Sequence, residues 1–360
     1  MKIDEKLLLM LEELGLTNYE AKAYIALIMR GISTASEIIE VSSIPQPRIY
    51  DIMTSLEEKG FVETQEGRPR KYRPINPKIA FHRYMEQLKE KQKHVTEVLS
   101  EVYSGEFVEE RPAIWITRGE ANIIGRSLQT IKEAEIELLV AIPSHLSLRL
   151  IKDLKEAYKR GVNISLVLYH DKMDERILKE LGEVAEIRVR EVPSMITVIA
   201  DRDIAVICSH EAIPPTPLPI RSGSYGITLE NRELVKILSD FYHYTLWRPA
   251  KSLTRKPLIK YPSKFVYIWN AIKEIKHLQV KGTKVLAIVE GRYVKTGQQF
   301  KLEAPITDIV WNPKNAVYSI ILEPKKGERI SVGGWGASVE DVEADVITII
   351  PKKESNLISH

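Results

Sequence analysis

The chain has 360 residues, 44% of them hydrophobic, so it is long enough for two or three domains, each with its own core. Its 52 basic and 49 acidic side chains nearly balance, so nucleic-acid binding would need a local basic patch rather than overall basicity. A membrane helix needs roughly 18 consecutive apolar residues, and no stretch of the sequence reaches this length. A signal peptide lacks carboxylates such as those in MKIDEKLLLMLEELG. The single cysteine, Cys208, excludes an internal disulfide and a thiolate metal cluster.

These limits indicate a cytoplasmic protein with no membrane partner. The spacing of His, Cys, Asp and Glu matches no metal site, and no glycine loop for phosphate is present in the sequence. Cys208 lies in the apolar run DIAVICS and is expected to be a buried strand residue.

Three helices are predicted between residues 17 and 60. Two capping boxes, Thr17 with Glu20 and Thr34 with Glu37, begin the first two helices, and the second ends at Ser42-Ser43. A third helix follows two prolines and ends at Gly60. Its inner face is apolar and contains Ile49, Ile52, Met53 and Leu56. The short turn before the third helix is typical of a helix-turn-helix.

A hairpin is predicted directly after the third helix, with the strands FVETQ and RKYRPI on either side of EGRP. It places Arg68, Arg70 and Lys71 at or near its tip. From Arg68 to Lys78 the chain has five basic residues and no acidic one, which favours contact with a phosphate backbone. This order of elements predicts a winged helix-turn-helix.

The outer side of the third helix offers candidates for contact with DNA bases. Gln46, Tyr50 and Ser55 are expected to be exposed, with Arg48 at the edge, and Gln and Arg can bond adenine and guanine edges in the major groove. The alternative is that these residues and the basic hairpin form only a solvated surface.

Three stretches resemble a known family. LTNYEAKAYIALI, IPQPRIYDIMTSLEEKGFVE and PAIWITRGEA are similar to sequences of the TrmB family of archaeal transcriptional regulators, and the resemblance is strongest in residues 14 to 116. It implies a winged helix-turn-helix joined to a sugar-sensing region.

A long helix is predicted over residues 78 to 105. Apolar residues recur at intervals of four and three, with one polar member, as in a heptad seam. The seam contains Phe81, Met85, Leu88, Gln92, Val95, Leu99 and Val102. We expect it to form a homodimer that presents two winged domains to a palindromic operator. The alternative is an amphipathic helix that packs on its own domain.

Residues 112 to 250 alternate between predicted strands and helices. This alternation predicts an α/β domain with a mostly parallel sheet. The family resemblance implies that the domain is phospholipase-D-like.

A phosphodiesterase of that type would carry His-x-Lys-x4-Asp. The corresponding stretch SMITVIADRD has Asp201 but neither histidine nor lysine, and HDKMDER at His170 lacks the aspartate. A nucleophile without a phosphate clamp stabilises little of a transition state, so we expect no enzyme activity. His145, His170 and His243 are isolated and are expected to be surface or packing residues.

Residues 262 to 351 are predicted to begin with a helix and continue as a β-rich domain. In SVGGWGASVED, glycines allow close approach of the backbone, and Trp335 offers an aromatic face of the kind on which sugars stack. The alternative is a glycine-rich hairpin with a core tryptophan.

The resemblance implies further sugar contacts. A Gly-Gly turn followed six residues later by glutamate is matched by Gly334 and Glu340. An expected asparagine is replaced by Tyr318 or Ser319, with Asn315 nearby. The resemblance also implies a sugar contact from the middle domain, and the corresponding residues here are Glu230 and Asn231.

The overall prediction is an α+β multidomain protein. It comprises a winged helix-turn-helix (1–77), a coiled-coil dimerisation helix (78–105), a phospholipase-D-like domain without its catalytic motif (112–250) and a β-rich sugar-binding domain (262–351). We expect a homodimeric repressor or activator of sugar transport or sugar metabolism genes. Its partners would be an operator in double-stranded DNA and a mono- or disaccharide such as maltose. The alternatives are an architectural DNA-binding protein without a ligand and a phosphodiesterase.

Overall fold

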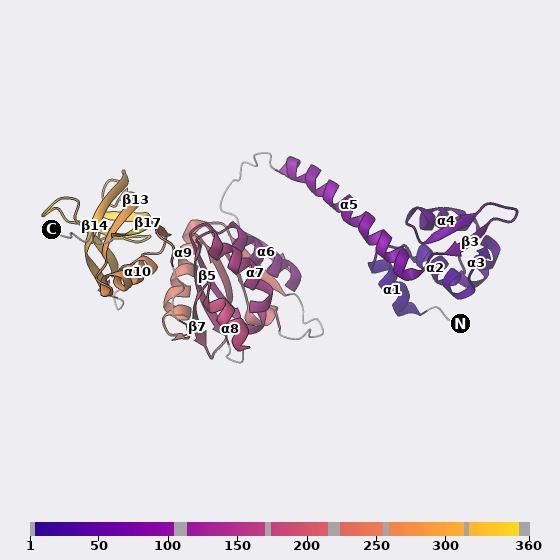
Figure 1. The fold of residues 1–360 in the computed structure, drawn as a ribbon, viewed down its shortest axis with the longest axis horizontal. Helices are drawn as coiled ribbons and strands as arrows, with labels where there is room; N and C mark the ends of the chain where they lie inside the picture. The colour runs from indigo at the N-terminus through magenta and orange to yellow at the C-terminus, as the bar shows by residue number, and fades with distance from the viewer. Residues whose placement is uncertain are drawn as a thin grey trace, which may run out of the picture. The chain divides into compact units, whose positions relative to one another are not determined.

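The computed structural model describes residues 4–103, 114–169, 174–214, 224–254, 259–312 and 317–352. The chain forms two units that divide between Glu109 and Glu110 (Figure 1). Among the described residues, no helix has both the length and the apolar character needed to cross a membrane.

The first unit contains the predicted helices and hairpin. Its elements are α1 (Glu5–Glu13), α2 (Asn18–Arg30), β1 (Ser33–Thr34), α3 (Ala35–Ser42), a 3-10 turn (Gln46–Arg48), α4 (Ile49–Glu58), β2 (Val62–Gln65), β3 (Lys71–Pro74) and α5 (Pro77–Tyr103). Both capping boxes are formed, at Thr17 with Glu20 and at Thr34 with Glu37. Among the described residues the strands form an antiparallel sheet in the order β1-β3-β2. The predicted order of three helices followed by a hairpin is therefore confirmed.

The core of this unit lies where α2, α4 and the hairpin meet. The ring of Phe61 makes edge-to-face contacts with Tyr24, Phe81 and Tyr84, with centroids 5.0 to 5.3 Å apart. A further helix, α1, which the sequence pattern did not predict, buries Leu8 and Leu11 against this core.

The helix α5 packs on its own unit only at its start. Ala80 and Tyr84 are buried, whereas every described side chain from Met85 to Ser100 is exposed. The alternative of a helix packed along its own domain therefore holds for the first two turns alone. Val102 of the predicted seam lies outside the residues whose side chains are described.

The second unit begins with the middle subdomain, residues 114–254. Its elements are β4 (Ile114–Arg118), α6 (Glu120–Glu133), β5 (Glu137–Pro143), α7 (Ser147–Lys159), β6 (Asn163–Tyr169), α8 (Glu175–Gly182), β7 (Glu186–Arg190), β8 (Ile196–Ala200), β9 (Ile204–Cys208), β10 (Tyr225–Leu229), α9 (Arg232–Phe241), a π-helical turn (Tyr242–Trp247) and β11 (Lys251–Ser252). Short 3-10 turns occur at Ser144–Leu146 and His210–Ala212. The strand order within the described residues is β11-β7-β6-β5-β8-β9-β10-β4.

The prediction of a mostly parallel sheet is wrong. In the described residues only β5 with β6 and β6 with β7 pair in parallel, and the other neighbouring strands are antiparallel. The reason is visible between β8 and β9, where Asp201 and Arg202 form a tight turn with φ of 52° and 75°. A connection this short joins antiparallel strands, since a parallel pair needs a crossover of a dozen or more residues.

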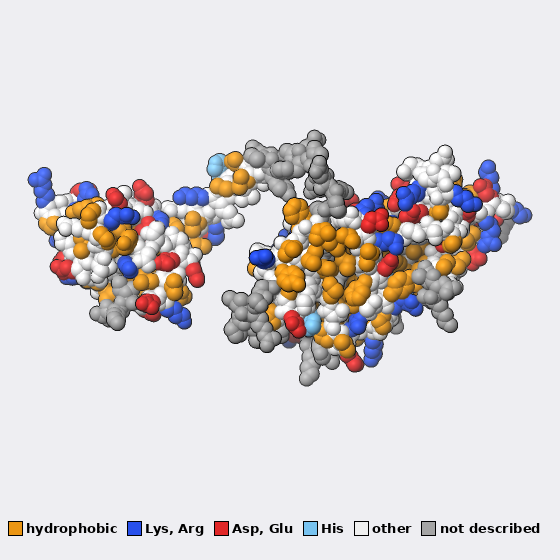
Figure 2. Space-filling view, turned by 180° about the vertical axis from the view of Figure 1, so that it is seen from behind, with side chains coloured by type: hydrophobic (Ala, Val, Ile, Leu, Met, Phe, Trp, Pro, Cys, Tyr) orange, Lys and Arg blue, Asp and Glu red, His pale blue; other side chains and the backbone are white. Residues whose placement is uncertain are grey.

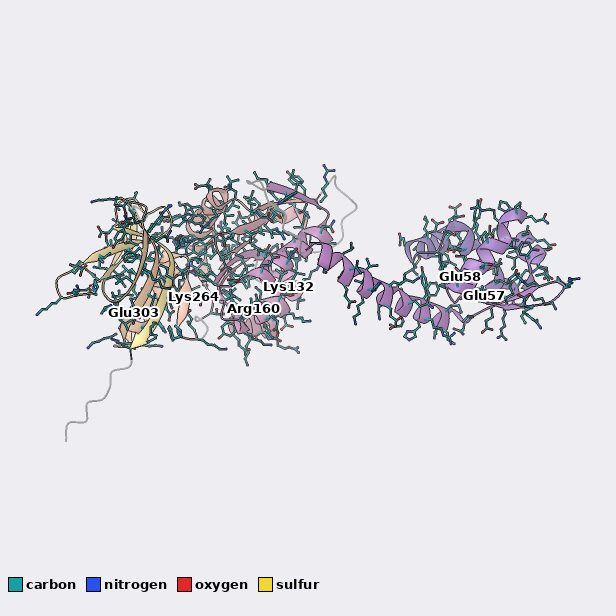
Figure 3. The ribbon with its side chains drawn as sticks, turned by 90° about the horizontal axis from the view of Figure 1, so that it is seen from above. Glu57, Glu58, Lys132, Arg160, Lys264 and Glu303 are labelled. Atoms are coloured by element: carbon teal, nitrogen blue, oxygen red, sulfur yellow. The ribbon has the colours of Figure 1, made fainter. Side chains whose placement is uncertain are left out.

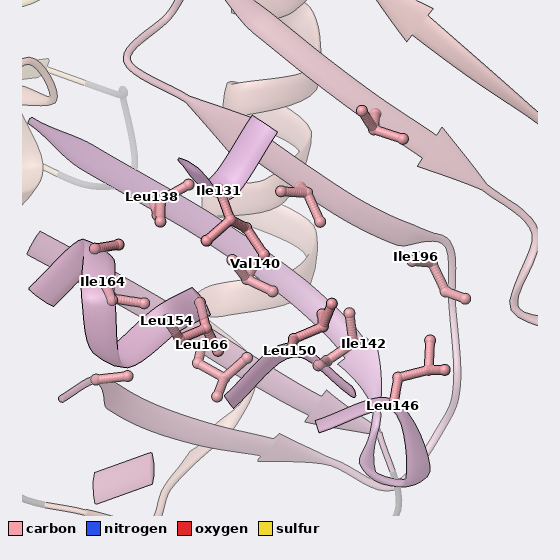
Figure 4. Close-up of a cluster of buried hydrophobic side chains, with 14 of the residues drawn as sticks. Ile131, Leu138, Val140, Ile142, Leu146, Leu150, Leu154, Ile164, Leu166 and Ile196 are labelled. Carbon is pink, nitrogen blue, oxygen red and sulfur yellow. The ribbon is translucent and has the colours of Figure 1, made fainter. Parts of the chain in front are cut away.

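Each face of the sheet packs against its own set of helices. On one face Leu138, Val140 and Ile142 of β5 meet Leu150 and Leu154 of α7 (Figure 4). On the other face, β5, β6, β8 and β9 pack against α9 and the π-helical turn. Cys208 is buried, as predicted.

The C-terminal end of α6 is capped by a side chain from the C-terminal end of α7. Arg160, labelled in Figure 3, donates to the carbonyl oxygens of Ile131, Lys132 and Ala134 at 3.0, 2.9 and 3.1 Å. A guanidinium group in this position satisfies carbonyls that have no partner inside the helix. It fixes the α6 end against α7.

The barrel subdomain, residues 259–352, follows. Its elements are β12 (Ser263–Phe265), α10 (Ile268–Val280), β13 (Lys284–Tyr293), β14 (Gln299–Asn312), β15 (Val317–Leu322), β16 (Ile330–Gly333) and β17 (Val342–Lys352). Within the described residues β17, β13, β14, β15 and β16 pair in sequence, and β16 pairs with β17 to close the ring. Closure removes free edges from a small sheet, and α10 packs against β13, β15 and β17.

A buried carboxylate joins the two subdomains. Glu137, the first residue of β5, accepts hydrogen bonds from the backbone N–H groups of Val266 and Tyr267 at 2.6 and 2.7 Å and from the amide of Asn270 at 2.8 Å. These donors lie at the start of α10, where backbone N–H groups have no partner inside the helix. The contact holds α10, and with it the barrel, against the sheet.

Candidate functional site

Three candidate DNA contacts lie at the start of α4. Gln46 and Arg48 are in the 3-10 turn and Tyr50 is in the first helical turn, and all three side chains are exposed. The guanidinium carbon of Arg48 lies 5.9 Å from the ring centroid of Tyr19 on α2. These side chains form one polar surface at the N-terminal end of the helix.

Ser55 is not part of that surface. Its hydroxyl donates to the buried carboxylate of Glu20 on α2 at 2.5 Å, and Lys59 donates to the same carboxylate at 2.7 Å. Burial raises the pKa of Glu20, but the hydrogen bonds from Lys59 and Ser55 outweigh it and hold the pKa below its usual value of 4.5. The prediction for Ser55 is therefore corrected, because its side chain serves the contact between α4 and α2.

The hairpin carries fewer free cations than the sequence suggested. Arg70 pairs with Glu66 at 2.9 Å and Arg73 pairs with Glu63. Arg68 and Lys71 are exposed, and neither forms an ion pair with another described residue. Arg68 and Lys71 are thus better placed than Arg70 to meet a phosphate without first breaking an internal pair.

A cavity of about 410 Å³ lies between the middle and barrel subdomains. We call it the aromatic pocket. It is lined by Arg202, Lys236, Ser239, Asp240, Tyr244, Tyr267, Ile268, Trp269, Val317, Tyr318, Gly334, Trp335, Gly336, Ala337, Ser338, Val339 and Glu340. Its walls therefore come from the turn between β8 and β9, from α9 and the π-helical turn, from the start of α10, from β15 and from the loop between β16 and β17.

Aromatic rings form one continuous wall of this pocket. Trp269 stacks on Tyr267 and on His243, with centroid distances of 4.8 and 4.3 Å. Tyr244 stacks on Tyr318 at 6.5 Å. Burial lowers the pKa of His243 to about 3, so its ring is neutral at ordinary pH and supports Trp269 from outside the pocket lining.

Charged and hydroxyl groups face this wall. Glu340 accepts a hydrogen bond from the Ser319 hydroxyl at 2.7 Å, and Asp240 pairs with Lys236 at 2.9 Å. The guanidinium of Arg202 is buried and donates to the Ala344 carbonyl at 3.2 Å, while its Nε has no partner among the described residues. The pocket thus combines flat apolar faces with hydrogen-bonding groups of both signs.

The two glycines of the Gly-Gly turn are required by packing. A Cβ on Gly334 would lie 2.5 Å from Cγ2 of Ile268, and one on Gly333 would lie 2.8 Å from the Glu340 carboxylate. Only glycine lets the loop lie against the start of α10 and beside Glu340. The predicted close approach is therefore present, and the structure supplies its physical reason.

Trp335 lines the pocket, but its ring already contacts two cations. The guanidinium carbons of Arg202 and Arg232 lie 5.2 and 5.7 Å from its centroid. Tyr244, Trp269 and Tyr318 offer further aromatic surface. Of these three, only Tyr318 was predicted from the sequence, because Tyr244 lies in the middle subdomain and Trp269 on α10, and neither belongs to the strands and loops that carry the Gly-Gly turn.

Glu230 and Asn231 lie outside the pocket and are corrected here. The Glu230 carboxylate accepts from the Trp115 indole at 3.0 Å and pairs with Arg126. Asn231 caps α9 by accepting from the Leu234 N–H at 3.1 Å. Asn315 lies outside the described residues.

The remaining candidate groups are possible metal ligands and the isolated histidines. In the described part of the chain, no three His, Cys, Asp or Glu side chains are grouped so that they could hold a metal ion. His145 Nε2–H donates a hydrogen bond to the Ile213 carbonyl oxygen at 3.1 Å, so this histidine has a structural role. His170 lies outside the described residues.

Comparison with protein families assigns all three parts of the chain. Residues 11–78 match the family described as sugar-specific transcriptional regulator TrmB, residues 113–254 match the N-terminal EBD subdomain of transcriptional regulator TrmB, and residues 260–352 match the C-terminal EBD subdomain of TrmB/TrmBL1. The chain belongs to the TrmB family. The resemblance found in the sequence is thereby confirmed.

Two curated TrmB relatives come from Pyrococcus furiosus. The HTH-type sugar sensing transcriptional regulator TrmBL1 is 27% identical over 354 residues, 97% of this chain and 99% of the relative. The putative HTH-type transcriptional regulator TrmBL2 is 33% identical over 180 residues, 47% of this chain and 68% of the relative. These TrmB relatives are named as regulators and not as enzymes.

A solved structure of TrmBL2, described as an archaeal chromatin protein with a novel mode of DNA binding, is also similar. It is 24% identical, with a TM-score of 0.38, and the match covers 70% of this chain and all of that structure. Because the TM-score is this low, no residue of this chain is assigned a role from that structure.

Proposed function

We propose that this protein is a sugar-responsive, DNA-binding transcriptional regulator. The observation that carries the proposal is the aromatic pocket, which brings Gly334, Glu340 and Tyr318 together with residues of α9 and α10. Membership of a family of sugar-specific transcriptional regulators supports it. The proposed genes are those of sugar transport or sugar metabolism.

The chemistry of the pocket suits a sugar. Its volume of about 410 Å³ is in the range of small-molecule sites. Aromatic faces can stack on the apolar face of a pyranose ring, and the carboxylates of Glu340 and Asp240 can accept hydrogen bonds from its hydroxyl groups. We propose a mono- or disaccharide as the effector, with Gly334, Glu340 and Tyr318 as contacts.

The DNA-binding role is assigned to the first unit. We propose that Gln46, Arg48 and Tyr50 contact bases or groove walls and that Arg68 and Lys71 contact phosphates. Arg70 would join them only by exchanging Glu66 for a phosphate. Operator DNA is the partner that this surface fits.

The proposed regulator is a homodimer held by α5. Met85, Leu88, Val95 and Leu99 lie along one side of a helix that buries none of them within its own chain. Pairing with the α5 helix of a second copy would remove this apolar seam from water. Two winged units could then meet two half-sites of a palindrome.

We further propose four functional parts with the boundaries given by the sequence: 1–77, 78–105, 112–250 and 262–351. The middle part, proposed to be phospholipase-D-like, would serve here as a scaffold for one wall of the pocket. Its stretch SMITVIADRD lacks the histidine and lysine that a phosphodiesterase of this kind requires, and HDKMDER at His170 lacks the aspartate.

The decisive experiment is a thermal-shift screen of the full chain against mono- and disaccharides. At least one sugar should raise the melting temperature, because a ligand that binds only the folded state stabilises it. Glu340→Ala should abolish that shift. Glu303→Ala, an exposed residue on the barrel labelled in Figure 3, should leave it unchanged. If no sugar shifts the wild-type protein, sugar sensing is ruled out.

A further inference from the structure

The eight-stranded sheet has a face that is covered at one end and bare at the other. Register defines which side chains share that face: Thr197 of β8 pairs with Ile207 of β9, Ile207 with Ile227 of β10, and Ile227 with Ile116 of β4. Because directly paired residues point to the same side of a sheet, these four side chains form one row.

Exposure rises steadily along this row. Thr197 is 1% exposed, Ile207 and Ile227 are half-buried, and Ile116 is 67% exposed. The covered end belongs to the apolar cluster that includes α9 and the π-helical turn. Among the described elements, none of those packed on this cluster extends over β4.

The bare end is apolar over several neighbouring positions. Ile114 is 54% exposed and Tyr225 is 60% exposed, and both lie on the same side as Ile116, two residues along their strands. We call Ile114, Ile116, Ile207, Tyr225 and Ile227 the β4 face. Figure 2 shows a broad area of hydrophobic side chains on the body of this unit.

The opposite side of β4 is different in kind. Trp115 points to the side covered by α6, and its indole donates to Glu230 at 3.0 Å. The exposed tryptophan therefore has a hydrogen-bond partner in its own chain, whereas the side chains of Ile114 and Ile116 are apolar and cannot form hydrogen bonds. An edge strand left to water normally carries charged or polar residues on its exposed side. A contiguous exposed apolar patch of this kind marks a protein contact.

The chain itself indicates which partner covers this face. The helix α5 ends at Tyr103 and β4 begins at Ile114, so ten residues separate them. Ten residues span at most about 36 Å. If two α5 helices pair in parallel, both β4 strands are tethered close to the same end of the paired helices, and each β4 face meets the other at a high effective concentration.

Self-complementarity also favours a second copy. A twofold contact places the same patch on both sides, so isoleucine would meet isoleucine and tyrosine. The five residues of the β4 face carry no charge, and the exposed Arg118, which pairs with Tyr225, lies beside them on the same side of the sheet. Burial of these five side chains against a second copy would place no charge at the centre of the contact, while Arg118 would lie at its border.

We propose that the β4 face is a self-association surface that packs against the β4 face of a second copy of this chain. The dimer would then have two contacts, one along α5 and one between the sensor units. The choice of partner rests on the pairing of α5 in the proposed function, while sugar binding plays no part in it.

The test uses the full chain and two matched substitutions. Ile116→Glu places a charge in the β4 face, and Leu148→Glu places one at an equally bare leucine, 62% exposed, on α7 across the sheet. Both positions are exposed within a single chain, so both variants should fold as the wild type does. Sedimentation velocity over a dilution series should show that Ile116→Glu raises the dimer dissociation constant roughly tenfold or more, while Leu148→Glu leaves it unchanged.

A cross-linking experiment tests proximity directly. With a short bismaleimide, Ile116→Cys should yield covalent dimers in high proportion and Leu148→Cys should yield few. Equal dissociation constants for the two glutamate variants, together with equal cross-linking of the two cysteine variants, would overturn the proposal. So would a wild-type chain that is monomeric at all concentrations. A dimer that passes both tests but binds no sugar would contradict the proposed function and leave this interface standing.

Discussion

Glu137 is the residue on which the joining of barrel and sheet depends most directly. It is fully buried and accepts hydrogen bonds from Val266, Tyr267 and Asn270. Burial raises the pKa of its carboxyl to about 7, although the three donors and the nearby Arg202 act in the opposite direction. The contact between the subdomains is therefore sensitive to pH near neutrality.

This pKa predicts how stability changes with pH. The folded chain holds the Glu137 proton up to about pH 7, whereas the unfolded chain loses it near 4.5. Between these values the folded state binds more protons, so the contribution of Glu137 to the free energy of unfolding is largest below pH 4.5 and falls as pH rises to about 7. The full change corresponds to about 3 kcal/mol.

Urea unfolding at a series of pH values measures this effect. Glu137→Gln should be less stable than wild type at low pH, and its free energy of unfolding should change less between pH 4.5 and 7. Identical pH slopes for the two proteins would show that the Glu137 carboxyl does not titrate in this range.

At the scale of the element, α5 presents the clearest mismatch between sequence pattern and environment. A helix whose apolar residues recur every three or four positions ordinarily buries that side. In α5, Leu88, Val95 and Leu99 remain exposed in the single chain. The free energy of burying them is available only to a second molecule.

This predicts the effect of a charge in the seam. Leu99→Glu should raise the dimer dissociation constant about a hundredfold or more, because a carboxylate would be buried where a leucine was expected. Ser100→Glu, one position along and outside the seam, is the matched control and should dimerise as wild type does. Size-exclusion chromatography with light scattering checks both. Equal dimer populations for the two variants would rule out this seam.

At the scale of the molecule, sugar and DNA would be bound by different units of one chain. If the sugar changes the affinity of the protein for DNA, thermodynamic linkage requires that DNA change the affinity of the protein for the sugar by the same factor. The aromatic pocket can transmit such an effect because its walls belong to two subdomains, whose relative positions a ligand can favour.

We therefore predict reciprocal coupling. With a duplex selected from a random-sequence pool, a saturating sugar identified by the thermal screen should change the DNA dissociation constant by about 5- to 150-fold. Fluorescence anisotropy measures the change. Glu340→Ala should bind the duplex as wild type does but show no response to the sugar. A sugar that binds and leaves DNA affinity unchanged would favour the architectural DNA-binding alternative.

The amino-acid sequence by itself determined the local elements of this protein. Capping boxes, prolines and glycines act through neighbouring residues, so the helices around Thr17 and Thr34 and the basic hairpin were predictable. The family was recognisable for the same reason, since its motifs are short and contiguous.

Tertiary structure decided what distant residues do to one another. Ser55 turned inward because Glu20 lies opposite it, and Arg70 found Glu66 across the hairpin. The closure of the barrel and the antiparallel order of the middle sheet depend on long-range pairing. The aromatic pocket depends on contacts such as that of Glu137 with Asn270, which hold α10 beside the sheet and bring Trp269 and Tyr318 to Tyr244. Contacts between residues so far apart in the chain leave no periodic pattern in the sequence, and only the packed fold specifies them.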